Sequence, residues 1–304
     1  MQNRLATMMV FFVACSTPET PPVGTKDSGP AVPSDASTSS DAAPADAAPS
    51  DAAPADAGAP SSGNVGGVFA ISDSVLVDGG VRGSHRAGAF FVHRTGEDTT
   101  TIARTVGPCL VEKLGGGKAP EERDVSAGAV HVTGGAKTID LVPSAKGTYA
   151  AISGNDSLWI GGEPLTVTAD GKDVPAFTVR LVAPSKVTLT APALPAARSS
   201  LEVTRQMPFL ATWRPAASGE VVLYFDIATG ASAYSATCNF KASAGVGEVP
   251  ASAFSDFPAG DGTFNFYAKE ASAVAPVDWS VRFTASSAMV GADDRRAEGT
   301  ATFR

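Results

Sequence analysis

The pattern of side chains from residue 65 to the C-terminus constrains the fold more than any other feature of this chain. Hydrophobic and polar residues alternate in short runs such as 88–94 (GAFFVHR), 220–227 (EVVLYFDI) and 263–269 (TFNFYAK). A period of two is typical of a β-strand, because successive side chains point to opposite faces of the sheet. We find no convincing amphipathic helix between the runs. The pattern therefore predicts an all-β fold built of sandwiches or barrels.

Further runs of this kind occupy 129–135, 137–143, 164–182 and 186–192. Asp170-Gly171 interrupts the longest of them, and an Asp-Gly pair between two alternating runs predicts a tight hairpin. Only 249–257 is expected to form a short helical turn.

Two stretches of the chain, 159–181 and 257–283, resemble each other. Each begins with an aromatic residue, passes through glycine into an alternating strand, meets a proline, and ends on a similar motif, FTVRL or WSVRF. We interpret this likeness as a duplicated β-domain with a boundary near 183–186. The predicted domains are therefore 65–184 and 185–304.

The second half resembles immunoglobulin-like and fibronectin-type domains in its layout. Trp213 lies in a predicted strand within 201–215, where a core tryptophan would lie, and 234–240 predicts a later strand. The Cys…Trp…Cys order of true immunoglobulin domains is absent from both halves. The resemblance implies two tandem β-sandwich (Ig-like) domains after a disordered N-terminal tether.

Residues 16–64 have the composition of that tether. They contain no aromatic residue, and Val23 and Val32 are their only branched aliphatic residues. Such a segment cannot bury enough apolar surface to offset the entropy lost on ordering. Within it, 41–60 repeats a D-A-A-P-x unit, in which proline favours an extended backbone and the aspartates repel one another. We predict an extended, solvated spacer.

Residues 1–15 have the parts of an export signal. Arg4 supplies a positive charge, 5–14 (LATMMVFFVA) supply an apolar run, and the small residue Ala14 stands directly before Cys15. An apolar run that stops at a cysteine resembles the lipobox of bacterial lipoproteins, in which the cysteine becomes the N-terminus and carries acyl chains. The resemblance implies lipidation of Cys15, and hence a lipid membrane as a partner through an N-terminal acyl anchor.

The order of lipobox, spacer and β-rich part also resembles uncharacterised secreted lipoproteins of Gram-negative soil bacteria. That resemblance implies a place in the cell envelope, anchored to the outer membrane. Ser16, rather than an aspartate, follows the cysteine, as in lipoproteins that are sorted to the outer membrane. The resemblance implies location and architecture but no activity.

Charge argues against one class of partner. The net charge of −8 is concentrated in the tether, which holds seven acids and one base. Residues 65–304 hold 24 acids against 21 lysines and arginines and have no basic cluster. Nucleic acid requires a positive stripe or patch, so we expect no nucleic-acid partner.

Two cysteines remain besides Cys15, and no pair has the C-x-x-C spacing of a zinc or redox site. We expect Cys109 and Cys238 to be buried, unreactive thiols. A disulfide that joins the two halves is the alternative.

The search for chemistry yields no catalytic, cofactor-binding or metal site. Of the three histidines, His85, His93 and His131, we expect the last two to face solvent from strands. The nucleophile pattern G-x-S-x-G is absent. Two acidic groups also carry arginines, which is typical of solvated loops: Glu121, Glu122 and Asp124, and Asp293, Asp294 and Glu298.

The sequence favours a non-enzymatic, lipid-anchored protein that binds or scaffolds an envelope protein or polysaccharide through its β-sandwiches. The first alternative is a secreted hydrolase with an unrecognised site at His93 or His131. The second is a carbohydrate-binding surface module. That alternative requires aromatic side chains exposed on one sheet face, and the candidates are Trp159, Tyr149 and Tyr267.

Overall fold

The computed structural model describes residues 63–304 except 73–75, 78–79, 82–84, 97, 155, 196–198 and 231. The predicted leader, the tether and Cys15 lie outside the described residues, apart from two positions. Gly63 and Asn64, which we assigned to the tether, are instead the first residues of a strand. The all-β prediction is confirmed, because the described elements are strands and two short 3₁₀ helices.

The strands of the first half are β1 (Gly63–Ser72), β2 (Leu76–Val77), β3 (Gly80–Val81), β4 (His85–Thr95), β5 (Thr101–Val106), β6 (Cys109–Leu114), β7 (Glu121–Asp124), β8 (Val130–Thr133), β9 (Ile139–Leu141), β10 (Ile152–Gly154), β11 (Pro164–Ala169) and β12 (Phe177–Val182). Those of the second half are β13 (Leu189–Ala191), β14 (Leu201–Val203), β15 (Phe209–Trp213), β16 (Glu220–Thr229), β17 (Ser232–Lys241), β18 (Val246–Val249), β19 (Gly260–Val274), β20 (Trp279–Ala288) and β21 (Glu298–Phe303). The 3₁₀ helices are η1 (Ala242–Ala244) and η2 (Ala251–Phe254).

Every alternating run that we singled out contains a strand, and the expected helical turn contains η2. The predicted hairpin also forms, as β11 and β12 in antiparallel register. Its connection, however, runs over the whole of 170–176, so the Asp170-Gly171 pair does not make the tight turn that we expected. Gly171 has a φ of 89°, a conformation that favours glycine, and it lies within this longer loop.

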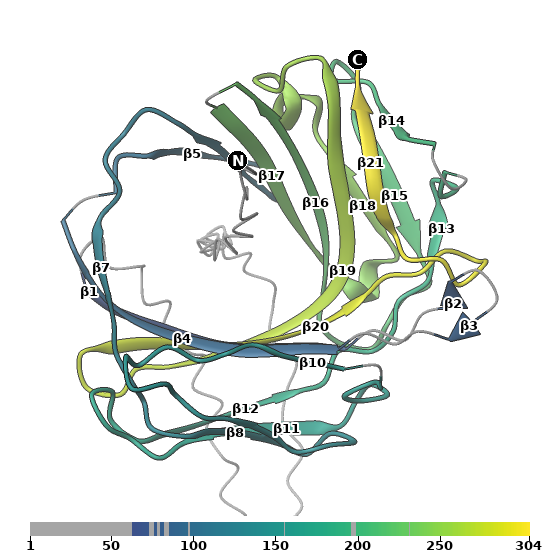
Figure 1. The fold of residues 1–304 in the computed structure, drawn as a ribbon. Helices are drawn as coiled ribbons and strands as arrows, with labels where there is room; N and C mark the ends of the chain where they lie inside the picture. The colour runs from purple at the N-terminus through teal and green to yellow at the C-terminus, as the bar shows by residue number, and fades with distance from the viewer. Residues whose placement is uncertain are drawn as a thin grey trace, which may run out of the picture. The chain divides into compact units, whose positions relative to one another are not determined.

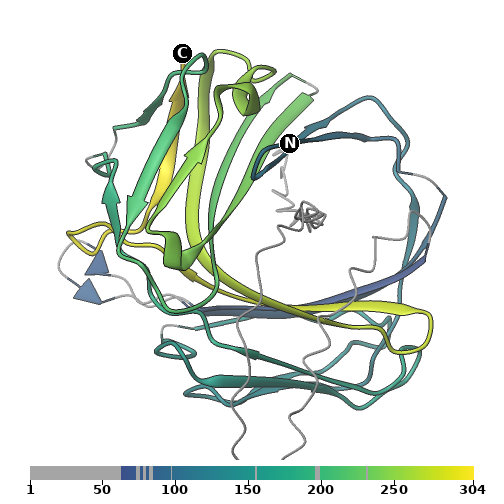
Figure 2. The ribbon, with the colours of Figure 1, turned by 180° about the vertical axis from the view of Figure 1, so that it is seen from behind.

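One long sheet organises the described part of the chain. Its main order is β10-β4-β1-β20-β19-β16-β17-β6-β5; in addition, β7 pairs with β4, β21 pairs with β19, and β14 pairs with β21. A four-stranded sheet (β12-β11-β8-β9) and a three-stranded sheet (β13-β15-β18) accompany it. Figures 1 and 2 show that the long sheet bends and that both small sheets lie on its convex side.

Each small sheet encloses one hydrophobic core against the long sheet. Phe225, Phe266 and Trp213 lie in the core beneath the three-stranded sheet. Phe91 and Phe283 lie in the core beneath the four-stranded sheet. Edge-to-face ring contacts add to burial, as between Phe225 and Phe266, whose centroids are 5.3 Å apart.

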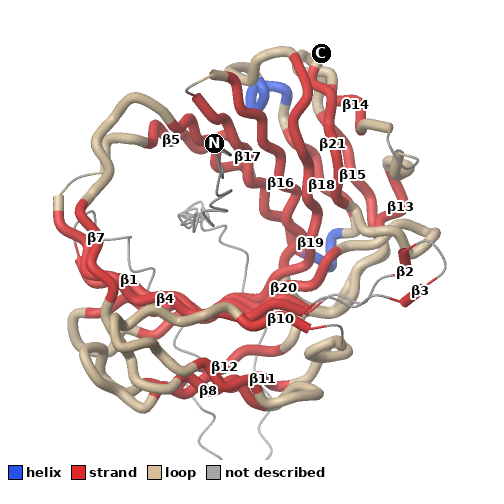
Figure 3. Tube along the Cα trace, viewed as in Figure 1, coloured by secondary structure: helices blue, strands red, loops and turns tan. Residues whose placement is uncertain are grey.

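The long sheet draws strands from both halves of the chain, which Figure 3 makes easy to trace. β1 pairs in parallel with β20, although more than two hundred residues separate them, with Val68 opposite Phe283. The β5–β6 hairpin of the first half joins the second half through β17. The division into tandem domains 65–184 and 185–304 is therefore not confirmed, because each core contains strands from both ranges.

The two similar stretches do not occupy equivalent places in separate domains. Phe177 of β12 and Trp279 of β20, which begin the two matching motifs, belong to the same core. Phe91 contacts both rings, at centroid distances of 6.0 Å to Phe177 and 6.4 Å to Trp279. The likeness therefore reflects two strands that enclose one core from opposite sheets.

Glycines make room for phenylalanines where β1 and β4 pair. Gly66 lies opposite Phe91, and Gly67 lies opposite Phe90. A Cβ atom on Gly67 would lie 2.6 Å from the ring of Phe90, and a Cβ on Gly66 would lie 2.3 Å from that of Phe91. Phe90 and Phe91 therefore place one ring on each face of the sheet, each beside a glycine of β1, because neighbouring residues of a strand point to opposite sides.

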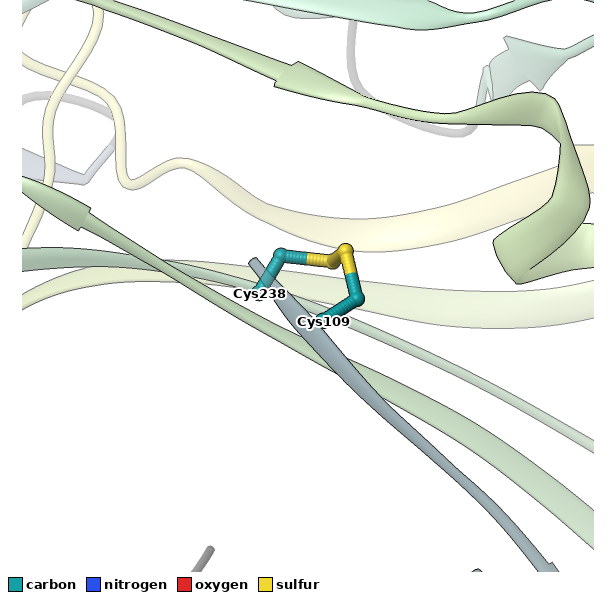
Figure 4. Close-up of a disulfide and its surroundings, with 2 residues drawn as sticks. All are labelled: Cys109 and Cys238. Carbon is teal, nitrogen blue, oxygen red and sulfur yellow. A yellow bond between two sulfur atoms is a disulfide. The ribbon is translucent and has the colours of Figure 1, made fainter. Parts of the chain in front are cut away.

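Cys109 and Cys238 form a disulfide, so our expectation of two free thiols is wrong (Figure 4). They lie directly opposite each other in the β6–β17 register. Both are buried in the core beneath the three-stranded sheet. The alternation placed both side chains in a core, but only the pairing of strands from different halves brought them together.

The disulfide is expected to contribute to stability, because it closes a loop over a sequence separation of 129 residues. In the chain-entropy treatment, a loop of this length contributes about 5 kcal/mol. The Cys109→Ala/Cys238→Ala variant should lose a stabilisation of this order in urea unfolding under oxidising conditions. Cys15→Ala is the matched control and should unfold like the wild type. An unchanged midpoint in the double variant would contradict the bridge.

Candidate binding face of the long sheet

His131 projects from β8 on the solvent side of the four-stranded sheet, as predicted. Its Nδ1 lies 2.6 Å from Oδ1 of Asp140, and its Nε2 lies 3.7 Å from Oδ1 of Asp170. The side chain is 37% exposed, and both carboxylates are more exposed still. Asp140 is within hydrogen-bond distance of one ring nitrogen, and Asp170 lies near the other. No serine or cysteine is hydrogen-bonded to this ring among the described contacts.

The other two histidines contribute to packing. His93 lies on the core side of β4, with its ring centroid 5.8 Å from that of Trp279, so our expectation that it faces solvent is wrong. His85 is buried, and its Nδ1 lies 2.5 Å from the carbonyl oxygen of Asp156. The sequence alternation misplaced His93, because the core face of β4 continues through Phe91 to the end of the strand.

The acidic groups are exposed, as predicted, although the first lies in a strand. Residues 121–124 form β7 and pair with β4, and Glu122 accepts hydrogen bonds from Arg94, the shorter of them at 2.6 Å. In the second group, Asp293 pairs with Arg295, whose guanidinium lowers the pKa of that carboxyl. Within the described part of the chain, no cluster of three or more His, Cys, Asp and Glu could hold a metal ion.

The three candidate aromatic residues do not share a face. Trp159 is buried, and its Nε1 donates to Ser287 Oγ at 3.0 Å. Tyr149 is half-buried, and its hydroxyl accepts from the backbone of Ala127 and donates to that of Gly128. Of the three, only Tyr267 points away from both cores, because its neighbours on β19, Phe266 and Ala268, are core residues.

Beside Trp159 is a cavity of about 290 Å³, at the lower end of the range for small-ligand sites. Most of the polar side chains that line it already have a hydrogen-bond or ion-pair partner within the protein. Ser72 Oγ accepts from the backbone N–H of Leu158 at 2.9 Å, and Lys186 pairs with Asp294 at 3.4 Å. The cavity therefore offers few unengaged groups for a ligand.

Tyr267 belongs to the face of the long sheet that points away from both cores, which we call the inner face. On β16 the alternation is strict, because Val221, Leu223 and Phe225 enter the core. The intervening side chains form the inner face, and so do their cross-strand neighbours. Its central residues come from β6, β16, β17 and β19: Glu112, Glu220, Val222, Tyr224, Asp226, Ser235, Thr237, Asn239, Thr263, Asn265, Tyr267 and Lys269.

Two tyrosines form the centre of the inner face. Tyr224 lies opposite Asn265, and Tyr267 lies opposite Val222, so the tyrosines are diagonal neighbours on adjacent strands. Val222 is fully buried although it points away from the core. Burial raises the pKa of Tyr267 to about 12 and also raises that of Tyr224, so both phenols stay protonated as hydrogen-bond donors.

A row of oxygen-bearing side chains runs across the strands beside the tyrosines. In register these are Glu112, Ser235, Asp226 and Thr263. Burial raises the pKa of Glu112, and a hydrogen bond with Ser235 opposes that shift. Burial likewise raises the pKa of Asp226, which accepts a hydrogen bond from Thr263.

On the other side of the tyrosines lies the cation of the central group, Lys269. Its Nζ donates to Asn239 Oδ1 at 3.0 Å and lies 3.0 Å from Glu220 Oε2. The lysine is therefore neutralised by a carboxylate of the same face. Because Glu112 and Asp226 have no such partner cation among the described ion pairs, the centre of the face is acidic.

A second aromatic group continues the inner face onto β1 and β4. Phe69 lies over Gly88 and Phe90 lies over Gly67, each near enough that a Cβ on the glycine would meet ring atoms at 2.6 Å. Phe90 is 42% exposed, unusually high for a phenylalanine in a paired strand. The guanidinium carbon of Arg86 lies 5.9 Å from the centroid of Phe69.

The inner face thus combines aromatic rings with neutral and acidic groups around the tyrosines and with two arginines, Arg86 and Arg282, around the phenylalanines. Such a set can hold a polar ligand by stacking and by hydrogen bonds. In comparisons with known proteins, no protein family, no curated protein and no solved structure matches the chain.

Of the residues on this face, only Tyr267 was a candidate from the sequence. Tyr224, Asp226 and Glu220 were already visible as the alternate positions of run 220–227. The place of Glu112 on this face could not be predicted, because nothing in its local sequence shows that β6 pairs with β17.

The raised pKa of Glu112 gives a test of this electrostatic account. The folded state resists ionisation of Glu112, so its share of stability is full below the unfolded pKa and falls as pH rises toward the folded pKa. Glu112→Gln should therefore unfold at higher urea concentration than the wild type at about pH 7, and the gain should shrink at about pH 4. Glu248→Gln, at an exposed position of β18, is the matched control. A loss of stability near neutral pH would contradict the account.

Proposed function

We propose that this protein is a lipid-anchored component of the bacterial cell envelope with a non-enzymatic role in binding or scaffolding. Cys15 is the attachment point, and the acidic, proline-rich tether separates the membrane from the β-rich part. The observation that carries the proposal is the leader, whose apolar run stops at Cys15 and gives way at once to the tether. An outer-membrane location is part of the proposal.

The β-rich part supports a binding role through its architecture. Its long sheet has one face packed against two cores and a second face rich in aromatic and polar side chains. A partner in the envelope, protein or polysaccharide, would meet that second face. Among the described residues, no helix is long and apolar enough to cross a membrane.

We also propose a modified form of the two-sandwich architecture. Each core is one sandwich, and the two halves of the chain exchange hairpins: β5–β6 goes to the second core and the end of β19 with β20 goes to the first. The separate core clusters support this interpretation. An immunoglobulin-like ancestry remains a prediction.

The hydrolase alternative gains no support from the histidines. His93 packs on Trp279 in the long sheet, and His131 faces the other way from the four-stranded sheet. The two therefore do not form a joint acid–base pair.

Lipid attachment is tested by metabolic labelling with radioactive palmitate. The wild-type chain should incorporate label and fractionate with membranes, whereas Cys15→Ala should lose both properties. Cys109→Ala/Cys238→Ala is the matched control and should keep its label. Equal labelling of wild type and Cys15→Ala removes the anchor from the proposal.

A further inference from the structure

We propose that the inner face binds a chain of neutral sugars, with Tyr224 and Tyr267 at one end of the site and Phe69 and Phe90 at the other. The inference rests on the proposed binding role and names the ligand class and the residues that take it. It selects polysaccharide from the two envelope partners considered above. Three properties of the face lead to it.

The first property is charge. Glu112 and Asp226 lie beside the tyrosines, while Lys269 is neutralised by Glu220. The other end of the face carries Arg86 and Arg282, so charges of both signs are present, and neither a polyanion nor a polycation complements the whole face. Carboxylates are strong hydrogen-bond acceptors, and they complement a ligand whose surface is covered with hydroxyl donors.

The second property is the presence of aromatic side chains on the uncovered face. Phe69 and Phe90 lie against Gly88 and Gly67, and Phe90 is 42% exposed. A sugar ring carries C–H groups that pack against the electron-rich face of an aromatic ring. An exposed aromatic ring such as that of Phe90 suits the flat, apolar side of a pyranose.

The third property is the supply of neutral hydrogen-bonding groups between and around the rings. Thr237 and Asn265 flank Tyr224 on the adjoining strands. Further along the sheet, Ser286 and Thr284 of β20 lie opposite Lys269 and Ala271 of β19. Amides and hydroxyls both donate and accept, so they can meet sugar hydroxyls in either role.

The two aromatic groups are placed for a chain rather than a single sugar. Along β19, Tyr267 precedes Ala271 by four residues, a rise of about 14 Å. Ala271 lies opposite Thr284, which lies opposite Phe69, so the second group is two strands further across, about 10 Å. A ligand that touches both groups must therefore be an oligomer of several units.

A direct test measures binding by titration calorimetry with three neutral hexasaccharides: cellohexaose, maltohexaose and chitohexaose. The protein is the full chain with Cys15→Ala, purified in detergent, so the result does not depend on acylation. At least one hexasaccharide should bind. Tyr224→Ala, Tyr267→Ala and Phe90→Ala should each weaken it about tenfold.

Three controls keep the result specific. Tyr224→Phe retains the ring and should bind within about threefold of the parent, which separates stacking from a general loss of structure. Leu210→Ala changes a side chain of β15 in the three-stranded sheet, where Leu210 is 54% exposed, and this variant should bind like the parent. Melting curves identify any variant that fails to fold, and Thr237→Val then tests the same surface.

The proposal is overturned if none of the three hexasaccharides binds, or if the ring substitutions leave the affinity unchanged. It is also overturned if hyaluronan hexasaccharide, which is anionic, or a hexalysine peptide binds more tightly than the neutral sugars. The last outcome would assign the acidic centre to a cationic peptide. None of these binding results affects palmitate labelling at Cys15, so failure of this inference and failure of the anchor are distinguishable.

Discussion

The β19–β20 hairpin is the element on which the rest of the structure depends. β19 begins against the three-stranded sheet, where Phe264 and Phe266 enter one core, and ends where Val274 packs against the other. β20 returns through the second core with Trp279, Val281 and Phe283. Two cores are thus tied to one continuous backbone, so neither can open without loosening strands that the other requires.

The long sheet bends between the two cores, and this shared hairpin runs through the bend (Figure 1). Both small sheets pack on the convex side (Figure 1), so the concave side is left without a packing sheet. A solvated sheet face is ordinarily filled with small polar and charged residues. This one carries Tyr224, Tyr267, Phe69 and Phe90, with Val222 buried among its neighbours. Their concentration on the concave side is the reason to regard it as a functional surface.

Much of the local structure was predictable, because alternation fixes which side of a strand is buried. The runs at 88–94 and 220–227 gave strands and their faces, apart from His93, whose strand stays against the core further than its sequence indicates. The order of strands in the sheet was not predictable. β1 meets β20, and β6 meets β17, through contacts between residues more than a hundred positions apart, which leave no local signal.

The same limit explains the errors over the cysteines and the site. The sequence predicted that Cys109 and Cys238 are core residues, but their disulfide depends on the pairing of β6 with β17 of the second half. Glu112 joins Asp226 in one row for the same reason. The aromatic faces of Phe69 and Phe90 required the β1–β4 register, which places each ring over a glycine.

The central claim is that the concave side of the long sheet is the surface that meets a ligand. Hydroxyl-radical footprinting of the full chain, with and without the tightest-binding neutral hexasaccharide, tests it most directly. The account predicts that oxidation of Tyr224, Tyr267 and Phe90 falls on addition of sugar. Oxidation of Met207, which is 61% exposed and lies just before β15 of the three-stranded sheet, should be unchanged. Protection of Met207 with no change at the three rings would contradict it.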